Sequence, residues 1–111
     1  MGQVVLVTGV SRYLGGRMAQ ILTQDPSVDR VIGVDVVAPR QEIGGAEFVR
    51  ADIRNPIIAK VIEAAQVDTV VHMGVIATPM QAGGRMSMKE INVIGTMQLL
   101  AACQKSPTVR K

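Results

Sequence analysis

Two runs rich in β-branched apolar residues open the chain, and three longer segments repeat apolar residues every three or four positions. The runs span residues 3–8 and 30–36 and predict strands buried on both faces of a sheet, and residues 47–51 and 69–73 predict two shorter strands. The helical spacing predicts helices over 14–23, 57–65 and 88–105. The order strand, helix, strand, strand, helix, strand, helix predicts an α/β fold with a Rossmann-type, doubly wound parallel sheet.

Capping residues mark the ends of two of these helices. Asn55 and Pro56 supply an N-cap and a first-turn proline before the second helix. The four residues from Ser87 to Glu90 form a capping box that starts the third helix at Met88, and Pro107 ends it. The boundaries of these helices therefore rest on end signals as well as on apolar spacing.

The connections between the elements carry three further expectations. Residues 74–86 form a Gly/Met/Pro-rich loop of a length that is usually kept for function. Val109 is expected to begin a fifth strand. The connection 37–46 is short for a parallel crossover and is the weak point of the parallel-sheet prediction.

Composition narrows the class of protein. A length of 111 residues predicts one domain, residues 1–111. The net charge of +3 comes from scattered basic residues, which excludes a nucleic-acid-binding stripe. One cysteine, Cys103, allows no internal disulfide and suits the reducing cytoplasm, and the chain begins without a signal-peptide pattern. No apolar run reaches the roughly 20 residues that are needed to cross a membrane. We also expect no metal site.

A glycine-containing loop lies between the first strand and the first helix, where a dinucleotide pyrophosphate would bind. Glycines let the backbone turn tightly and approach the phosphates, while free N–H groups of the helix attract the anion. The strand before and the helix after supply the context that such a motif requires. A purely structural alternative is that Gly9 only makes the turn and Gly15 only permits close packing. The predicted cofactor-binding residues here are Gly9, Ser11, Arg12, Tyr13, Leu14 and Gly15.

Acidic residues follow the second and third strands. Asp35 lies 20 residues after Gly15, where a carboxylate would accept hydrogen bonds from the adenosine ribose and repel a 2′-phosphate. Asp52 and Ile53 end the third strand, close to the expected position of an adenine. Two structural alternatives stay open: Asp35 could be a solvated strand-end carboxylate, and Asp52 could simply cap its loop.

With these residues in place, the chain resembles the N-terminal portion of the extended short-chain dehydrogenase/reductases, the NAD-dependent epimerase/dehydratase family. The matching elements run in order along the chain: Thr8-Gly9 to Gly15, Asp35, Ala51-Asp52-Ile53, His72-Met73-Gly74 and Asn92-Val93-Ile94-Gly95-Thr96. The resemblance implies that NAD is the cofactor and that Met73, Gly74 and Val75 line its nicotinamide side. It also implies a structural role for Asn92, and we expect His72 to pack at the strand end.

Two residues in the glycine loop depart from the family pattern. The extended branch has a second glycine where this chain has Arg12, and the single-domain branch has one where this chain has Tyr13. Arg12 therefore occupies a tight position, and a basic residue there can favour NADP. Asp35 argues for NAD, because a carboxylate beside a 2′-phosphate is repulsive and Arg12 can turn to solvent.

The family's catalytic residues have no counterpart in the chain. Members use a tyrosine whose pKa is lowered by a lysine four residues later, after the fifth strand. The one tyrosine here, Tyr13, lies in the cofactor loop and is followed four positions on by Arg17. We therefore expect a sheet truncated after about four strands, with the catalytic and substrate-binding parts absent and no catalytic residue.

Several functions remain open at this point. The resemblance favours the NAD-binding part of a nucleotide-sugar epimerase or dehydratase that is inactive alone, with the sugar bound only by a full-length parent. Alternatives are a carbonyl or sterol-type reductase of the same branch and a non-catalytic NAD(P)-sensing module. A methyltransferase-like fold would share the glycine loop and acidic strand end, but Thr8-Gly9 and the motif at 92–96 argue against it.

Self-association is a further expectation. Apolar residues nearly encircle the helix predicted over 88–105, and a helix that is apolar all round is normally buried all round. The strand predicted over 69–73 would also present an unpaired apolar edge. The apolar helix residues are Ile91, Val93, Ile94, Met97, Leu99, Leu100, Ala101, Ala102 and Cys103.

Overall fold

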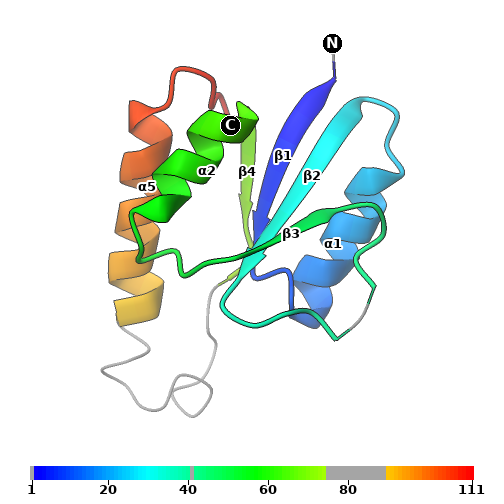
Figure 1. Cartoon of the computed structure of the whole chain (residues 1–111), viewed down its shortest axis with the longest axis horizontal. Helices are drawn as coiled ribbons and strands as arrows, with labels where there is room; N and C mark the ends of the chain where they lie inside the picture. Colours follow the sequence, from blue (N-terminus) through cyan, green and yellow to red (C-terminus); the bar gives the residue numbers. More distant parts are fainter. Residues whose placement is uncertain (1, 41, 75–89) are drawn as a thin grey trace.

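The predicted strands form one parallel sheet in the order β3-β2-β1-β4 (Figure 1). The structure is a computed structural model that describes residues 2–40, 42–74 and 90–111. This arrangement confirms the predicted Rossmann-type α/β class. The elements are β1 (Gln3–Thr8), α1 (Tyr13–Thr23), β2 (Val28–Asp35), β3 (Glu47–Arg50), α2 (Ile57–Ala65), β4 (Thr69–His72), η1 (Glu90–Gly95) and α5 (Thr96–Lys105).

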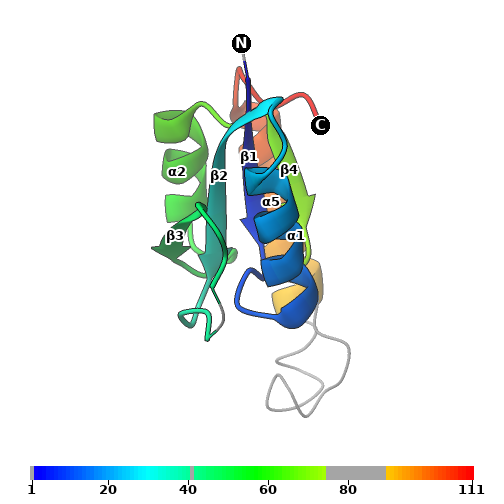
Figure 2. The same ribbon diagram turned by 90° about the vertical axis from the view of Figure 1, so that its right-hand side faces the viewer.

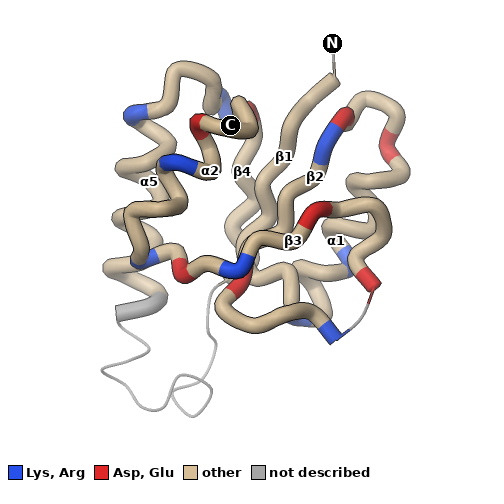
Figure 3. Tube along the Cα trace, viewed as in Figure 1, with Lys and Arg blue, Asp and Glu red and all other residues tan. Residues whose placement is uncertain are grey.

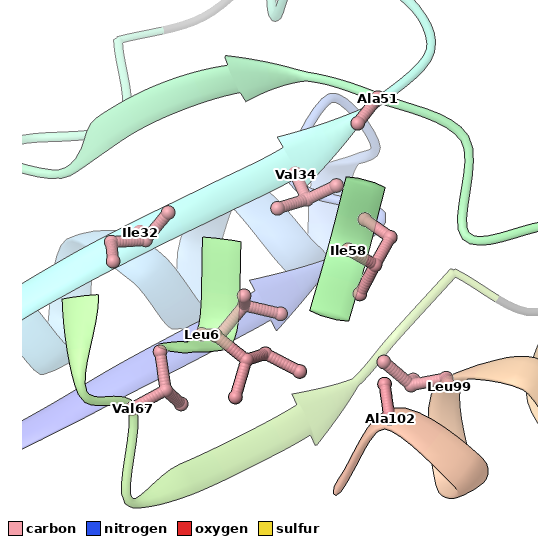
Figure 4. Packing of buried hydrophobic residues seen from close by; sticks show 9 residues of the cluster. Leu6, Ile32, Val34, Ala51, Ile58, Val67, Leu99 and Ala102 are labelled. Atoms are coloured by element: carbon pink, nitrogen blue, oxygen red, sulfur yellow. The ribbon is translucent and has the colours of Figure 1, made fainter. Parts of the chain in front are cut away.

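Helices cover both faces of the sheet, with α1 on one side and α2 and α5 on the other (Figure 2). Successive residues of a strand point to opposite faces. Val5 and Val7 of β1 accordingly pack in the cluster that contains Ala19 of α1. Leu6 points the other way, into a cluster that joins the sheet to α2 and α5 (Figure 4). Its labelled members are Leu6, Ile32, Val34, Ala51, Ile58, Val67, Leu99 and Ala102.

The helix-free connection between β2 and β3 is compatible with parallel strands, contrary to the argument from its length. Ile43 is buried in the same cluster as Ala19, so the connection runs along the α1 side of the sheet. Gly44 turns the chain there with a φ of +69°, in the left-handed region that favours glycine. The side-chain amide of Gln20 also donates to the Glu42 carbonyl. Buried apolar contacts thus take the place of a crossover helix.

The last helix differs from the single α-helix predicted. Its described part opens with six residues of π-helix, η1, before α5 begins at Thr96. Gly95 is buried where a Cβ would lie 2.8 Å from Cδ1 of Ile53, so the segment after β3 packs directly on the junction of η1 and α5. The predicted end at Lys105 is confirmed, whereas the start at Met88 lies outside the described residues.

The end of the chain lies beside β4 without forming the predicted strand at Val109. The Val70 N–H donates to the Lys111 carbonyl at 2.8 Å, and the Arg110 N–H donates to the Asp68 carbonyl at 2.8 Å. The outer edge of β4 is therefore partly paired by the chain itself. The expectation of a wholly unpaired edge was wrong, because the residues after α5 return to it.

Gly33 tests the packing between β2 and the glycine loop. A Cβ on Gly33 would lie 2.6 Å from Cγ2 of the buried Val10, so Gly33→Ala should destabilise the fold by about 1–3 kcal/mol. Gly45→Ala is the matched control, because a Cβ there meets nothing within 4 Å. Urea denaturation measures both free energies of unfolding, and equal values for the two variants would contradict this packing.

Candidate cofactor-binding site

The carboxyl ends of the strands enclose a cavity of about 110 Å³ at one edge of the sheet. Ligands of open α/β sheets bind at this edge, where neighbouring strands send their connections to opposite faces. Among the predicted residues, Gly9, Arg12, Asp35, Asp52, Ile53 and Gly74 line the cavity. The lining residues that sequence reasoning did not include are Thr8, Val34, Val36, Ala51 and Arg54.

Gly9 and Gly74 bring the ends of β1 and β4 into direct backbone contact. Gly9 has a φ of +72°, and a Cβ on it would lie 2.6 Å from the Gly74 Cα. Gly15 is equally constrained, because its Cβ would lie 2.1 Å from the Gly9 carbonyl oxygen. The close packing proposed as the structural alternative therefore does require glycine at these positions. Gly9 and Gly74 also line the cavity.

The first turn of α1 presents unpaired backbone donors. Among the described residues, the N–H groups of Tyr13, Leu14 and Gly15 have no hydrogen-bond partner. The N-cap residue, Arg12, makes no side-chain capping bond, and the turn contains no acidic side chain. These N–H groups and the helix dipole favour an anion. Because the Tyr13 and Leu14 side chains are exposed, these two residues can contribute through their backbone.

Arg12 fits its position without strain. Its φ of −92° and ψ of 161° are extended values that any residue adopts, and its N–H donates to the Gly9 carbonyl at 3.1 Å. The backbone conformation at this position therefore does not require the glycine that the family has there. The side chain is half-buried and lines the cavity.

Asp35 connects β2 to the glycine loop. Its Oδ2 accepts the Ser11 N–H at 3.1 Å, and its Oδ1 accepts the Val36 N–H at 2.7 Å. The Ser11 hydroxyl also donates to the Val37 carbonyl. Ser11 is therefore hydrogen-bonded both to the last residue of β2 and to the segment that follows it. A carboxylate has about four lone-pair sites, which leaves Asp35 able to accept two further donors. Asp35 is thus more than a solvated strand-end carboxylate.

Asp52 forms an ion pair with Arg54 on the opposite wall. The Arg54 Nε–H donates to Oδ1 at 3.0 Å and an Nη2–H donates to Oδ2 at 2.6 Å. These side-chain hydrogen bonds are the main reason that the pKa of Asp52 lies below its usual value. The Arg54 backbone N–H also donates to Asp52, so this residue caps its loop as well as lining the cavity. A single sequence contains no signal for this pairing beyond the short spacing.

The remaining predicted residues lie beside the cavity or outside the described chain. Met73 packs against the α1-side cluster, and its N–H donates to the Thr8 hydroxyl at 3.0 Å. Val75 lies outside the described residues. His72 is half-buried at the end of β4, as expected, and Asn92 lies in η1. Tyr13, the one tyrosine, is exposed on α1.

Charge and metal chemistry add no second site in the part of the chain that the structure describes. Basic and acidic residues are spread along the trace rather than gathered in one patch (Figure 3). Within 2–40, 42–74 and 90–111, no group of His, Cys, Asp and Glu could hold a metal ion. None of the helices in these ranges has the length and apolar character needed to cross a bilayer.

A sequence comparison now assigns the family. The model described as the NAD dependent epimerase/dehydratase family matches residues 5–111. The chain belongs to this family. The predicted cofactor, NAD, is the one named in the family's description.

Curated relatives are much longer than this chain. An uncharacterized protein of Mycobacterium tuberculosis is 54% identical over 113 residues, which cover 98% of this chain and 30% of the relative. The human short-chain dehydrogenase/reductase family 42E member 1 is 36% identical over 107 residues, covering 91% of this chain and 26% of the relative. The chain thus spans less than a third of the length of these proteins.

Solved structures share the fold at low sequence identity. A UDP-glucose 4-epimerase of Thermus thermophilus in complex with NAD has a TM-score of 0.81 at 23% identity, covering 96% of this chain and 35% of that one. One from Stenotrophomonas maltophila, with bound NAD and formylated UDP-arabinopyranose, has a TM-score of 0.79 at 24% identity, covering 96% and 34%. This likeness supports the doubly wound architecture.

Proposed function

We propose that the chain binds NAD at the carboxyl edge of its sheet. The observation that carries the proposal is the position of Asp35, which lines the cavity beside the glycine loop and keeps acceptor capacity. The residues present suit a dinucleotide, because Gly9 and Gly74 line the cavity with backbone and without side chains. Membership of an NAD-dependent family supports the same assignment.

Each part of the edge suits a different part of the cofactor. The free N–H groups of residues 13–15 would hold the pyrophosphate, and Asp35 would accept the ribose hydroxyls. Asp52 and Ile53 would flank the adenine. Met73 and Gly74 would lie on the nicotinamide side. When bound, NAD supplies hydride acceptance and donation.

NAD is preferred over NADP in this proposal. A 2′-phosphate on the ribose would approach the Asp35 carboxylate, and two like charges repel each other. Arg12 also lines the cavity and is the residue that would favour NADP. Asp35 decides the preference, because it is fixed in place by two backbone N–H donors whereas Arg12 makes no side-chain capping bond.

For the whole protein we propose a cytoplasmic nucleotide-sugar epimerase or dehydratase, of which residues 1–111 are the cofactor-binding part. The support comes from the family and from the fold shared with UDP-glucose 4-epimerases. A carbonyl or sterol-type reductase is the alternative within the same branch, and a non-catalytic NAD(P) sensor is the alternative outside it. The half-buried thiol of Cys103, the one cysteine, suits the reducing cytoplasm.

We also propose that the chain associates with a second copy through the exposed face of its last helix. Leu99 and Ala102 point into the core, while Val93, Ile94, Met97 and Leu100 remain 45–65% exposed at helical spacing. An apolar helix face of this kind is stabilised when another surface covers it. The partly paired edge of β4 makes the helix the main contact in this proposal.

Isothermal titration calorimetry tests the cofactor. The chain should bind NAD more tightly than NADP. Asp35→Ala should lower the affinity for NAD roughly tenfold to a hundredfold, because hydrogen bonds to a charged acceptor contribute about 1.5–3 kcal/mol. The difference in affinity between NAD and NADP should also become smaller. Asp29→Ala, which removes an exposed carboxylate at the other end of β2, is the control. Tighter binding of NADP by the unmodified chain would overturn the preference and point to Arg12.

Turnover assays test the proposal that residues 1–111 are only the cofactor-binding part of the whole protein. Residues 1–111 alone should show no epimerase, dehydratase or reductase activity. Loss of a positioned acid or base typically costs roughly 10²–10⁴ in rate, and the one tyrosine is exposed on α1. Product analysis with UDP-sugars and NAD measures this. Conversion of any nucleotide sugar by the purified chain would contradict the proposal.

Light scattering at micromolar concentration tests association. The chain should exceed the monomer mass of 11.8 kDa, and Met97→Lys with Leu100→Lys should return it to the monomer, because charges on the exposed face oppose its burial. Ile21→Lys, at an exposed apolar position on α1, is the control and should leave association unchanged. A monomeric mass for the unmodified chain would contradict the proposed association through this helix face.

A further inference from the structure

The Thr8 hydroxyl is the centre of a buried hydrogen-bond network beneath the cavity. Thr8 is fully buried at the carboxyl end of β1. Its oxygen accepts the Met73 N–H at 3.0 Å and the Gly74 N–H at 3.1 Å. It also lies 2.6 Å from Nδ1 of His72, whose Nε2 lies 2.9 Å from the hydroxyl of Thr96. One network thus joins β1, β4 and the start of α5.

Counting donors and acceptors fixes the proton on the imidazole. A hydroxyl has one hydrogen and two lone pairs, and the two backbone N–H groups occupy both lone pairs of Thr8. The hydroxyl hydrogen must therefore point to His72 Nδ1, which can accept it only without a proton of its own. A neutral imidazole carries its proton on the other nitrogen, so His72 Nε2–H donates to Thr96.

Little charge surrounds this imidazole on the described elements. β1 and β4 carry no charged side chain, and the charge on α5, Lys105, lies in its last turn. Arg54, from the segment after β3, lies beside Gly95 and is paired with Asp52. η1 begins with Glu90. Desolvation by burial lowers the pKa of His72 below its ordinary value, which agrees with a neutral ring.

We propose that His72, as the neutral Nε2–H tautomer, is a positioning residue for the cofactor site. This inference rests on the proposed binding of NAD at this edge. Thr8 and Gly74 line the cavity, whereas His72 acts on it through the Thr8 hydroxyl. The hydroxyl holds the Gly74 N–H while the Gly74 backbone lies against Gly9, so the imidazole supports the contact between two residues that line the cavity.

Protonation of His72 should oppose NAD binding. The imidazolium would place an Nδ1–H against a Thr8 oxygen whose lone pairs are already taken, so the network has to break. NAD binds the intact network, and its affinity should therefore be highest above the pKa of His72 and fall as the pH drops through it. By linkage, bound NAD should lower that pKa further, by about one unit for each tenfold difference in affinity between the two protonation states.

Nuclear magnetic resonance of the imidazole tests the proposal directly, because His72 is the one histidine in the chain. With 15N-labelled histidine, the chemical shifts should identify the Nε2–H tautomer in the protein without NAD. A pH titration should give a lower pKa with saturating NAD than without it. An Nδ1–H tautomer, or the same pKa in both titrations, would overturn the proposal.

Substitutions separate the two hydrogen bonds of His72, one with Thr8 and one with Thr96. His72→Leu should lower the affinity for NAD about tenfold. His72→Asn should retain most of the affinity, because its Oδ1 can replace Nδ1 as the acceptor of the Thr8 hydrogen. Thr96→Val removes the hydrogen bond on the other side of the ring and should lower the affinity less. Unchanged affinity in His72→Leu overturns the positioning role alone. Absence of NAD binding by the unmodified chain overturns the proposed function and this inference together.

Discussion

The contact between the backbones of Gly9 and Gly74 is the constraint on which the carboxyl edge of this sheet depends. No side chain fits between them, since a Cβ on Gly9 would lie 2.6 Å from the Gly74 Cα. Once β1 and β4 meet this closely, the buried Thr8 hydroxyl can take the N–H groups that follow β4. The chain then turns at Gly9 and enters α1 with its first N–H groups facing outward.

The same geometry suits the dinucleotide proposed for this edge. In the proposal, the free N–H groups at the start of α1 form the anion site, and Asp35 on the neighbouring strand accepts the ribose hydroxyls. The bonds from the Ser11 and Val36 N–H groups hold that carboxylate in place before any ligand arrives. A site formed in advance would lower the entropy lost when NAD binds.

Periodicity and motif context predicted the strands, the parallel sheet and most of the cavity wall. Gly9, Asp35 and Asp52 follow directly from the rule that sites form where parallel strands end. Contacts between residues far apart in the chain could not be read from one sequence. The π-helical turns of η1 and the return of the last residues to β4 depend on such contacts. The Asp52–Arg54 ion pair is local, but a spacing of two residues does not by itself predict that the side chains pair. The family pattern has a glycine where this chain has Arg12, and the extended backbone there explains why an arginine fits.

The family supplies the expectation of NAD, and the geometry supplies a place for it at one edge of the sheet. A titration of the 15N-labelled chain with NAD, followed through its backbone amide signals, tests that placement directly. Signals of residues 9–15, Val36 and Gly74 should shift, while those of Gly2, Asp29 and Asp68 at the opposite edge should not. Shifts confined to the opposite edge, or none at millimolar NAD, would contradict a cofactor site at the carboxyl ends of the strands.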